Sequence, residues 1–249
     1  MIDARNAAVA ERFSRSAHRY ESEAVIQRAA AVRFDAWLSH QYALTPQRIA
    51  EIGCGTGFLT RLLRKRFPDS LIQATDLAPK MVEHCRNSMH GDGRVEWTVC
   101  DGRNVSFAPP QDWVVSAMCF QWFDPLLPVL RHHLSQSRAL GFSIMLDRSF
   151  SAWRAAHENA GLQPGLHRCP SYEQVLDACH ALGGSRVRSE RIWLHQEFPD
   201  GRSFARSLRA IGADKPRTDH ASVNLKPVLR ILENGVTADY EIGFFYVER

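Results

Sequence analysis

The stretch Ile49-Ala50-Glu51-Ile52-Gly53-Cys54-Gly55-Thr56-Gly57 decides the fold expected for this chain. A short apolar run opens into three alternating glycines, and the next apolar run ends at Asp76. Glycines lack Cβ atoms, so a backbone can approach a ligand there, and a helix beginning near Phe58 would point amide donors into the same space. Asp76 offers an acceptor suited to a ribose diol. The pattern predicts a nucleotide-like ligand held across one strand–loop–helix unit.

The spacing of these glycines separates two classes of ligand. Dinucleotide-binding loops read G-x-G-x-x-G, whereas this motif places its residues at alternate positions: Glu51, Gly53, Gly55 and Gly57. An acidic residue inside the motif would repel a pyrophosphate but suits a cation such as a sulfonium. The spacing therefore disfavours a nicotinamide-dependent oxidoreductase. A glycine-rich turn that merely joins a strand to a helix is the alternative interpretation.

The alternating motif resembles the first motif of class I S-adenosylmethionine-dependent methyltransferases, and the resemblance implies S-adenosylmethionine as the cofactor. A third strand-like segment, residues 94–102, carries Asp101, which in this family would accept a hydrogen bond from the adenine amino group. Asp and Gly also form ordinary turns. The cofactor-binding residues that the resemblance implies are Glu51, Gly53, Gly55, Gly57, Asp76, Leu77, Met81, Asp101 and Gly102.

Hydrophobic periodicity predicts an α/β fold. After a polar arm at 12–19 and a helix at about 20–40, strands are expected at 48–53, 71–75, 95–99, 113–117 and 140–146, with helices at 58–67, 79–89 and 125–135. The last third predicts helices at 150–160 and 172–182, a strand at 187–197, a helical region at 201–233 and a strand at 238–247. We therefore expect a Rossmann-like, mostly parallel seven-stranded sheet with an antiparallel C-terminal hairpin, and a ligand site at the carboxyl ends of its parallel strands. In methyltransferases, segments inserted before such a hairpin form a helical cap, here the arm 1–40 and the inserts 150–171 and 200–234.

Composition favours one globular enzyme domain over residues 1–249. The chain is 45% hydrophobic, and its six cysteines form no C-x-x-C pair. With no apolar signal segment at the N-terminus, we expect a reduced, cytoplasmic location. We also expect no metal, membrane or nucleic-acid partner, and His132-His133 at the polar end of a helix.

The net charge is only +4, but arginines form two clusters. Arg61, Arg64, Lys65 and Arg66 make up the first, and Arg202, Arg206, Arg209, Lys215 and Arg217 the second. Either cluster would steer an acidic partner, or it forms a solvated helix face.

Four segments narrow the resemblance: residues 13–21, 24–27, 116–122 and 203–213 are similar to malonyl-acyl-carrier-protein O-methyltransferases of biotin synthesis. The resemblance implies methylation of the free carboxylate of malonyl-acyl-carrier protein, an acidic protein substrate. From its clustering alone, we expect the second cluster to attract this acidic carrier, with Arg202, Arg206 and Arg209 as substrate-binding residues. One departure is visible, because relatives commonly have Asn where Ala117 stands.

The expected chemistry needs positioning more than proton transfer. A carboxylate is already ionised at neutral pH, so no general base is required. A guanidinium would hold it, with Arg148 as the first candidate and Arg154 as the second, although both also suit an exposed surface. Tyr20 and Gln121 would donate hydrogen bonds near the methyl group, and Trp122 would form an apolar wall or a core contact. Another small-molecule O- or C-methyltransferase and a non-catalytic binding relative remain the alternatives.

Overall fold

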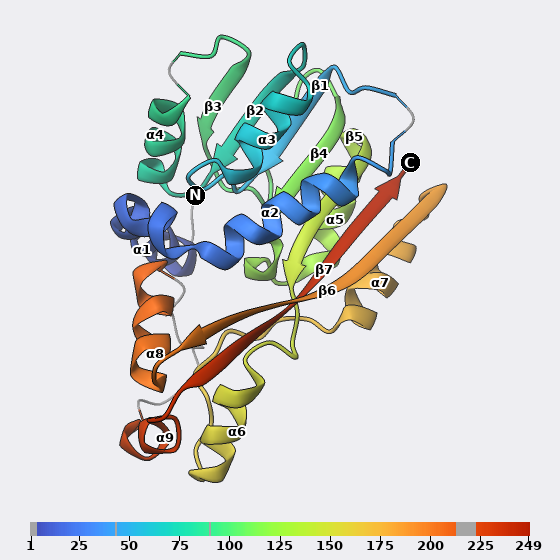
Figure 1. The fold of residues 1–249 in the computed structure, drawn as a ribbon. Coiled ribbons are helices and arrows are strands. Elements are labelled where there is room, and N and C mark those ends of the chain that lie inside the picture. Colours follow the sequence, from blue (N-terminus) through green and yellow to red (C-terminus); the bar gives the residue numbers. More distant parts are fainter. Residues whose placement is uncertain (1–3, 43, 90, 213–222) are drawn as a thin grey trace.

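The computed structural model describes residues 4–42, 44–89, 91–212 and 223–249, and within them seven strands form one sheet (Figure 1). Their order is β3-β2-β1-β4-β5-β7-β6. The first five strands run parallel, and β7 is antiparallel to both of its neighbours. This confirms the predicted mostly parallel sheet with an antiparallel C-terminal hairpin. The strands are β1 Arg48–Ile52, β2 Leu71–Asp76, β3 Val95–Val99, β4 Gln111–Ala117, β5 Ser137–Met145, β6 Arg186–Phe198 and β7 Val236–Glu248.

Helices cover both faces of the sheet. On one face α2 Val25–Leu38, α3 Phe58–Arg66 and α4 Pro79–Ser88 bury a core that includes Phe34 and Leu63. On the other face α5 Leu126–Ser135 and α7 Tyr172–His180 bury a second core around Leu130 and Val175. Because both faces are covered, the central strands β1 and β4 are buried at nearly every position, polar residues such as Glu51 and Ser116 included.

The N-terminal arm differs from its prediction. Instead of a polar arm and one helix, the structure has α1 Ala4–Glu23 and α2, separated at the buried Ala24. Phe13, Ala17 and Tyr20 recur at helical spacing on one face of α1 and pack near Met81 of α4. Arginines occupy much of the remaining surface of α1, so its overall polarity hid a narrow apolar stripe.

A cap of helices lies at the carboxyl end of the parallel strands, where α1, α6 Ser151–Asn159, α8 Gly201–Ala210 and α9 Lys226–Ile231 gather around the extended β6–β7 hairpin (Figure 1). Phe204 of α8 is fully buried at the cap's centre. Its ring centroid lies 5.3 Å from that of Phe150, 5.2 Å from that of Trp153 and 5.5 Å from that of Phe198. This aromatic cluster joins the insert after β5 to the insert before β7. Ala213, Lys215 and Arg217 lie outside the described residues.

Candidate active site

The glycines of the motif have different roles. All three adopt positive φ, 73° at Gly53, 54° at Gly55 and 95° at Gly57. A Cβ at Gly53 would lie 2.4 Å from the sulfur of Cys119, and one at Gly57 would lie 2.4 Å from the sulfur of Cys85. A Cβ at Gly55 would meet nothing within 4 Å. We expected all three to make room for a ligand, but two of them make room for packed cysteines, and only Gly55 faces open space.

Asp76 ties the end of β2 to this loop. Its Oδ2 accepts a hydrogen bond from the backbone N–H of Gly55 over 2.9 Å, and its Oδ1 accepts one from Ala78 over 2.8 Å. Burial raises the pKa of Asp76, while the backbone donors of Ala78, Gly55 and Leu77 oppose that rise. The carboxylate is thus held in a fixed orientation beside the open side of Gly55.

Asp76 borders a cavity of about 750 Å³, a size typical of small-molecule sites at roughly 300–1,000 Å³. It lies at the carboxyl ends of the parallel strands, and α1 covers it with Phe13 and Tyr20. Most of the expected site residues border it: Tyr20, Gly53, Asp76, Leu77, Met81, Asp101, Gly102, Gln121 and Trp122. Gly55, Gly57 and Glu51 are not among its lining residues.

Glu51 lies on β1 beneath the loop and is 1% exposed. Burial is the main cause that raises its pKa to about 7, and the nearby Asp76 adds to the rise. Its Oε2 has no hydrogen-bond partner among the described residues. Near neutral pH this side chain is therefore partly protonated, and its position favours support of the glycine loop over direct contact with a ligand.

Asp101, the acidic residue predicted to bind an adenine, forms hydrogen bonds with the side chain of Arg103. Arg103 donates to Oδ2 of Asp101 from Nη2 over 2.6 Å and from Nε over 3.1 Å. Next to it, a Cβ on Gly102 would lie 2.5 Å from Cγ2 of Ile52, so only glycine lets this loop pack against β1. The pair of residues forms a tightly packed wall of the cavity.

The environment of His133 differs from the one predicted from the sequence. It lies in the last turn of α5, as predicted, but it is fully buried rather than at a polar helix end. Its Nε2 lies 2.7 Å from the carbonyl oxygen of Gly102, and because a carbonyl only accepts, Nε2 donates the proton. Burial lowers the pKa of His133 to about 4, so the ring stays neutral at physiological pH. The histidine fastens the Asp101-Gly102 loop from behind.

A second, smaller cavity of about 60 Å³ adjoins the first. Both are lined by the same seven residues: Phe13, Tyr20, Met118, Gln121, Trp122, His167 and Cys169. Residues of the cap complete the lining of the second cavity, among them Leu208 and Ile211 from the α8 segment and Arg154 from α6. The expected cofactor site therefore shares one wall with a chamber that residues of the cap complete.

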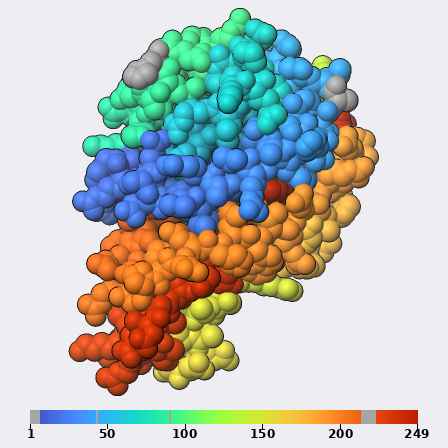
Figure 2. Space-filling model, viewed as in Figure 1, coloured from blue at the N-terminus to red at the C-terminus, as the bar shows by residue number. Residues whose placement is uncertain are grey.

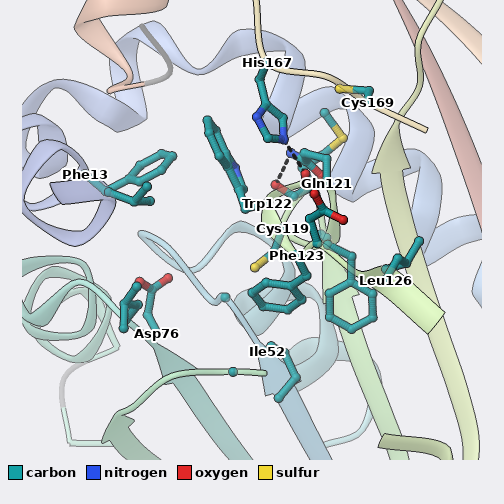
Figure 3. Close-up of a pocket in the computed structure, with 18 of the residues that line it drawn as sticks. Phe13, Ile52, Asp76, Cys119, Gln121, Trp122, Phe123, Leu126, His167 and Cys169 are labelled. Carbon is teal, nitrogen blue, oxygen red and sulfur yellow. Dashed lines mark hydrogen bonds between the residues drawn. The ribbon is translucent and has the colours of Figure 1, made fainter. Parts of the chain in front are cut away.

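Hydrogen bonds and ring contacts order this shared wall (Figure 3). Gln121 donates from Nε2 to the Met118 carbonyl over 2.7 Å, and His167 donates from Nε2 to the Gln121 carbonyl over 2.5 Å. The His167 ring stacks on Trp122 with centroids 4.7 Å apart, and Trp122 meets Phe13 edge-on at 5.7 Å. Sequence reasoning missed His167, because it lies in an irregular stretch between α6 and α7 that carries no periodic signal.

The strand that leads into this wall ends in strained backbone. Met118 follows β4 and has φ 53°, a conformation that non-glycine residues rarely adopt. Its N–H donates to the Ser143 carbonyl over 2.9 Å, which holds it in place. Ala117, where relatives were expected to carry Asn, lines the first cavity directly before it.

The two candidate arginines lie in different environments. Arg148 is exposed in the turn after β5, its backbone N–H donates to Oε2 of Glu241 over 3.2 Å, and it lines neither cavity. Arg154 is half-buried, donates from Nε to the Ser149 carbonyl over 2.9 Å, and lines the second cavity. Arg154 lies in the first turn of α6, which begins directly after the N-cap Phe150. The geometry therefore favours Arg154, the second candidate, over Arg148.

The two arginine clusters also differ. On α3, Arg61 pairs with Glu21 at 2.7 Å, Arg64 pairs with Asp92 at 2.7 Å, and Arg66 pairs with Asp35. These ion pairs connect α3 to α1, to α2 and to the turn between α4 and β3. Arg202, Arg206 and Arg209 are exposed on α8 and line neither of the two cavities.

Two further findings concern ligands and membranes. Within the described part of the chain, no three His, Cys, Asp or Glu side chains gather in a way that would hold a metal ion. No helix in that same part is long and apolar enough to cross a membrane.

Comparison with known proteins agrees with this geometry. Residues 49–138 match the methyltransferase domain family. Across 89% of this chain and 83% of the other, the fold is similar to the crystal structure of magnesium protoporphyrin IX methyltransferase from Synechocystis PCC 6803 with bound S-adenosylhomocysteine, with a TM-score of 0.57 and 14% identity. At that identity the likeness shows the fold alone.

Curated relatives match over nearly the whole chain. It is 29% identical over 253 residues to the malonyl-[acyl-carrier protein] O-methyltransferase of Magnetococcus marinus, with 97% of this chain and 93% of the relative covered. It is 30% identical over 241 residues to the protein of the same name from Acetivibrio thermocellus, with 89% and 84% covered. The chain belongs to the malonyl-[acyl-carrier protein] O-methyltransferase family, on a class I methyltransferase fold.

Proposed function

We propose that this enzyme transfers the methyl group of S-adenosylmethionine to the free carboxylate of malonyl-acyl-carrier protein, giving the methyl ester that enters elongation toward pimeloyl for biotin synthesis. When bound, S-adenosylmethionine supplies a methyl group on a sulfonium, which needs only a well-placed nucleophile. The remaining requirements fall on the protein: to bind the donor, to orient the acceptor and to exclude water.

The first cavity fits the donor. Gly53 and Asp76 line it, and the Asp76 carboxylate provides an acceptor suited to a ribose diol. Asp101 and Gly102 form the wall where an adenine would lie, and His133 holds that wall from behind. In the proposed arrangement the sulfonium end faces the shared wall at Tyr20 and Gln121, where the second cavity begins.

The lining of the second cavity suits the carboxylate end of the acceptor. Among the described residues that line it, Arg154 alone carries a guanidinium, and the remainder of the lining is largely apolar. A carboxylate entering this chamber would meet that guanidinium, which orients two oxygens at once. Trp122 and Phe13 shield the same junction from water. Shielding strengthens the attraction between an anionic acceptor and a cationic donor.

Burial disfavours the ionised form of three of the protein's own nucleophilic side chains in and near the shared wall. Burial, with a smaller contribution from Asp76, raises the pKa of Tyr20 and of Cys119. Burial also raises the pKa of Cys169 to about 12. At neutral pH these groups stay protonated, whereas a malonyl carboxylate is ionised. The site thereby favours the substrate over its own side chains as methyl acceptor, and it needs no general base.

The observation that carries this proposal is the wall shared by the two cavities, with Asp76 bordering one and Arg154 the other. The test is a competition experiment in which purified protein and S-adenosylmethionine meet malonyl-acyl-carrier protein together with a panel of small carboxylic acids and phenols. We expect the malonyl carrier to receive the methyl group as a base-labile ester, read by mass spectrometry. Preferential methylation of a phenol or of carbon would instead support another small-molecule methyltransferase on this fold.

A further inference from the structure

A third hollow lies outside the two cavities, between α1 and α8. It is an open groove of about 790 Å³. Arg12, Arg15 and Arg19 of α1 line one side, and Arg206 and Arg209 of α8 line the other. Figure 2 shows the blue N-terminal helices lying directly against the orange region that contains β6 and α8. The groove therefore brings together two arginine rows that are far apart in the sequence.

The charge of the groove is strongly unbalanced. Besides the five arginines, His18 lines it, whereas Glu23 is the one carboxylate among its described lining residues. Arg15 also faces Glu11 at 3.4 Å, but that pair is an exposed i,i+4 contact of little strength. On α3, by contrast, most of the basic side chains are matched by carboxylates. Among the described residues that line it, the α1–α8 groove thus carries more positive than negative side chains.

Both helices that form the groove also form the substrate chamber. Phe13 and Tyr20 of α1 project into the second cavity, as do Leu208 and Ile211 at the end of α8. The arginines occupy the outer faces of the same helices. A molecule held in the groove would therefore lie against the outside of the chamber wall.

The two helices are held at close range. A Cβ on Gly212, directly after α8, would lie 3.1 Å from Oγ of Ser16 and 3.2 Å from the backbone of Arg12. Gly212 has φ 75°. This contact sets the spacing between the two arginine rows.

We infer that the α1–α8 groove is the docking surface for an acidic protein face, that of the carrier which presents the malonyl thioester to the chamber. The inference rests on the proposed function and extends it, because α1 supplies half of the surface. A single phosphate would be held by a few convergent donors. Arginines spread along two helices beside an open groove fit an extended acidic surface instead, and they steer its approach.

The test uses two charge-reversal variants, Arg15→Glu/Arg19→Glu on α1 and Arg206→Glu/Arg209→Glu on α8. Arg33→Glu/Arg131→Glu is the matched control, because it changes the net charge equally at exposed positions outside the groove. Arg15→Lys/Arg19→Lys keeps the charge. Each protein is assayed with malonyl-acyl-carrier protein, with malonyl-coenzyme A and with malonyl-N-acetylcysteamine, which lacks a phosphate.

We expect each reversal variant to raise KM for the carrier substrate at least tenfold, to change kcat less than twofold, and to leave both small thioesters unaffected. The salt dependence of kcat/KM with the carrier should also become weaker. The matched control and the lysine variant should behave as wild type.

Three results would overturn the inference. A lower kcat/KM with malonyl-coenzyme A but not with malonyl-N-acetylcysteamine would indicate a phosphate site. An equally lower kcat/KM with all three substrates would indicate a structural role. Unchanged kinetics with the carrier substrate would exclude docking. Fluorescence anisotropy of labelled carrier separates this question from the reaction. If wild type methylates no malonyl thioester, the proposed function fails, while carrier binding that depends on the α1 arginines still supports the groove.

Discussion

The Asp76 carboxylate accepts a hydrogen bond from the backbone N–H of Gly55 over 2.9 Å, and so joins the second strand of the sheet to the glycine loop of the first. One oxygen holds the loop, and the other holds the turn into α4 through Ala78. The residue expected to contact the ligand thus also shapes the place where the ligand would lie.

Replacing Asp76 should therefore weaken donor binding. We expect Asp76→Ala to reduce affinity for S-adenosylhomocysteine by roughly 10- to 100-fold, because hydrogen bonds to a charged group contribute about 1.5–3 kcal/mol. Isothermal titration calorimetry measures the change, and Asp76→Asn tests the charge separately from the shape. Wild-type affinity in Asp76→Ala would place the ligand elsewhere.

Two substitutions in the glycine loop should affect different properties, one mainly the affinity for the donor and the other mainly the stability of the fold. Gly55→Ala introduces a Cβ into open space, so beyond the roughly 1–2 kcal/mol cost of positive φ it should act mainly on donor affinity. Gly57→Ala meets the Cys85 sulfur and should lower the free energy of unfolding by about 1–3 kcal/mol more. Urea denaturation and calorimetry of both variants measure the two effects. Equal unfolding free energies would contradict the assignment.

Two buried groups should give opposite pH dependences. Burial raises the pKa of Glu51 from 4.5 to about 7, so its carboxyl group holds a proton in the folded state. The contribution of this protonated group to the free energy of unfolding is lost as pH rises through 7. His133, with a pKa lowered from 6.5 to about 4 by burial, stays neutral in the folded state, so its contribution is lost as pH falls toward 4. Between pH 4.5 and 6.5 the two slopes oppose each other.

Removing one of the two groups should therefore leave the pH dependence of the unfolding free energy that the other group causes. In Glu51→Gln, unfolding free energy should rise with pH between 4.5 and 6.5, and in His133→Gln it should fall, each by up to about 3 kcal/mol. Urea denaturation at several pH values provides the measurement. Parallel pH profiles for wild type and both variants would show that neither group titrates as described.

The two candidate arginines give a direct comparison of position. Arg154→Gln should lower kcat/KM for a malonyl thioester by roughly 10- to 100-fold, because a charge-assisted contact to the acceptor is lost. Arg148→Gln is the matched control and should stay within about twofold, since Arg148 is exposed in the turn. Arg154→Lys should recover part of the activity. A larger loss at Arg148 would reverse the order that the structure favours.

Much of the fold follows from local sequence patterns. The predicted strand at 95–99 coincides with β3, and the glycine motif lies between β1 and α3 as its spacing indicated. The strand β1 is predictable because it is buried along most of its length and carries a short apolar run, and β3 because β-branched and aromatic residues favour an edge strand. The helix α1 was missed because its apolar stripe is narrow and arginines surround it.

The parts of the site that sequence did not reveal depend on tertiary packing. The burial of His133 and the use of Gly57 to accommodate Cys85 follow from contacts between distant segments. The placement of Arg154 rather than Arg148 in the chamber depends on how the chain turns after β5. His167 reaches the shared wall from an irregular stretch. Such placements require the folded arrangement, since no local pattern encodes them.

A crystal structure with S-adenosylhomocysteine bound tests the central claim most directly. The account predicts the ribose at the Asp76 carboxylate and the sulfur facing the wall of Tyr20 and Gln121, toward the chamber that contains Arg154. A ligand outside the first cavity, or one whose sulfur points away from that wall, would contradict it.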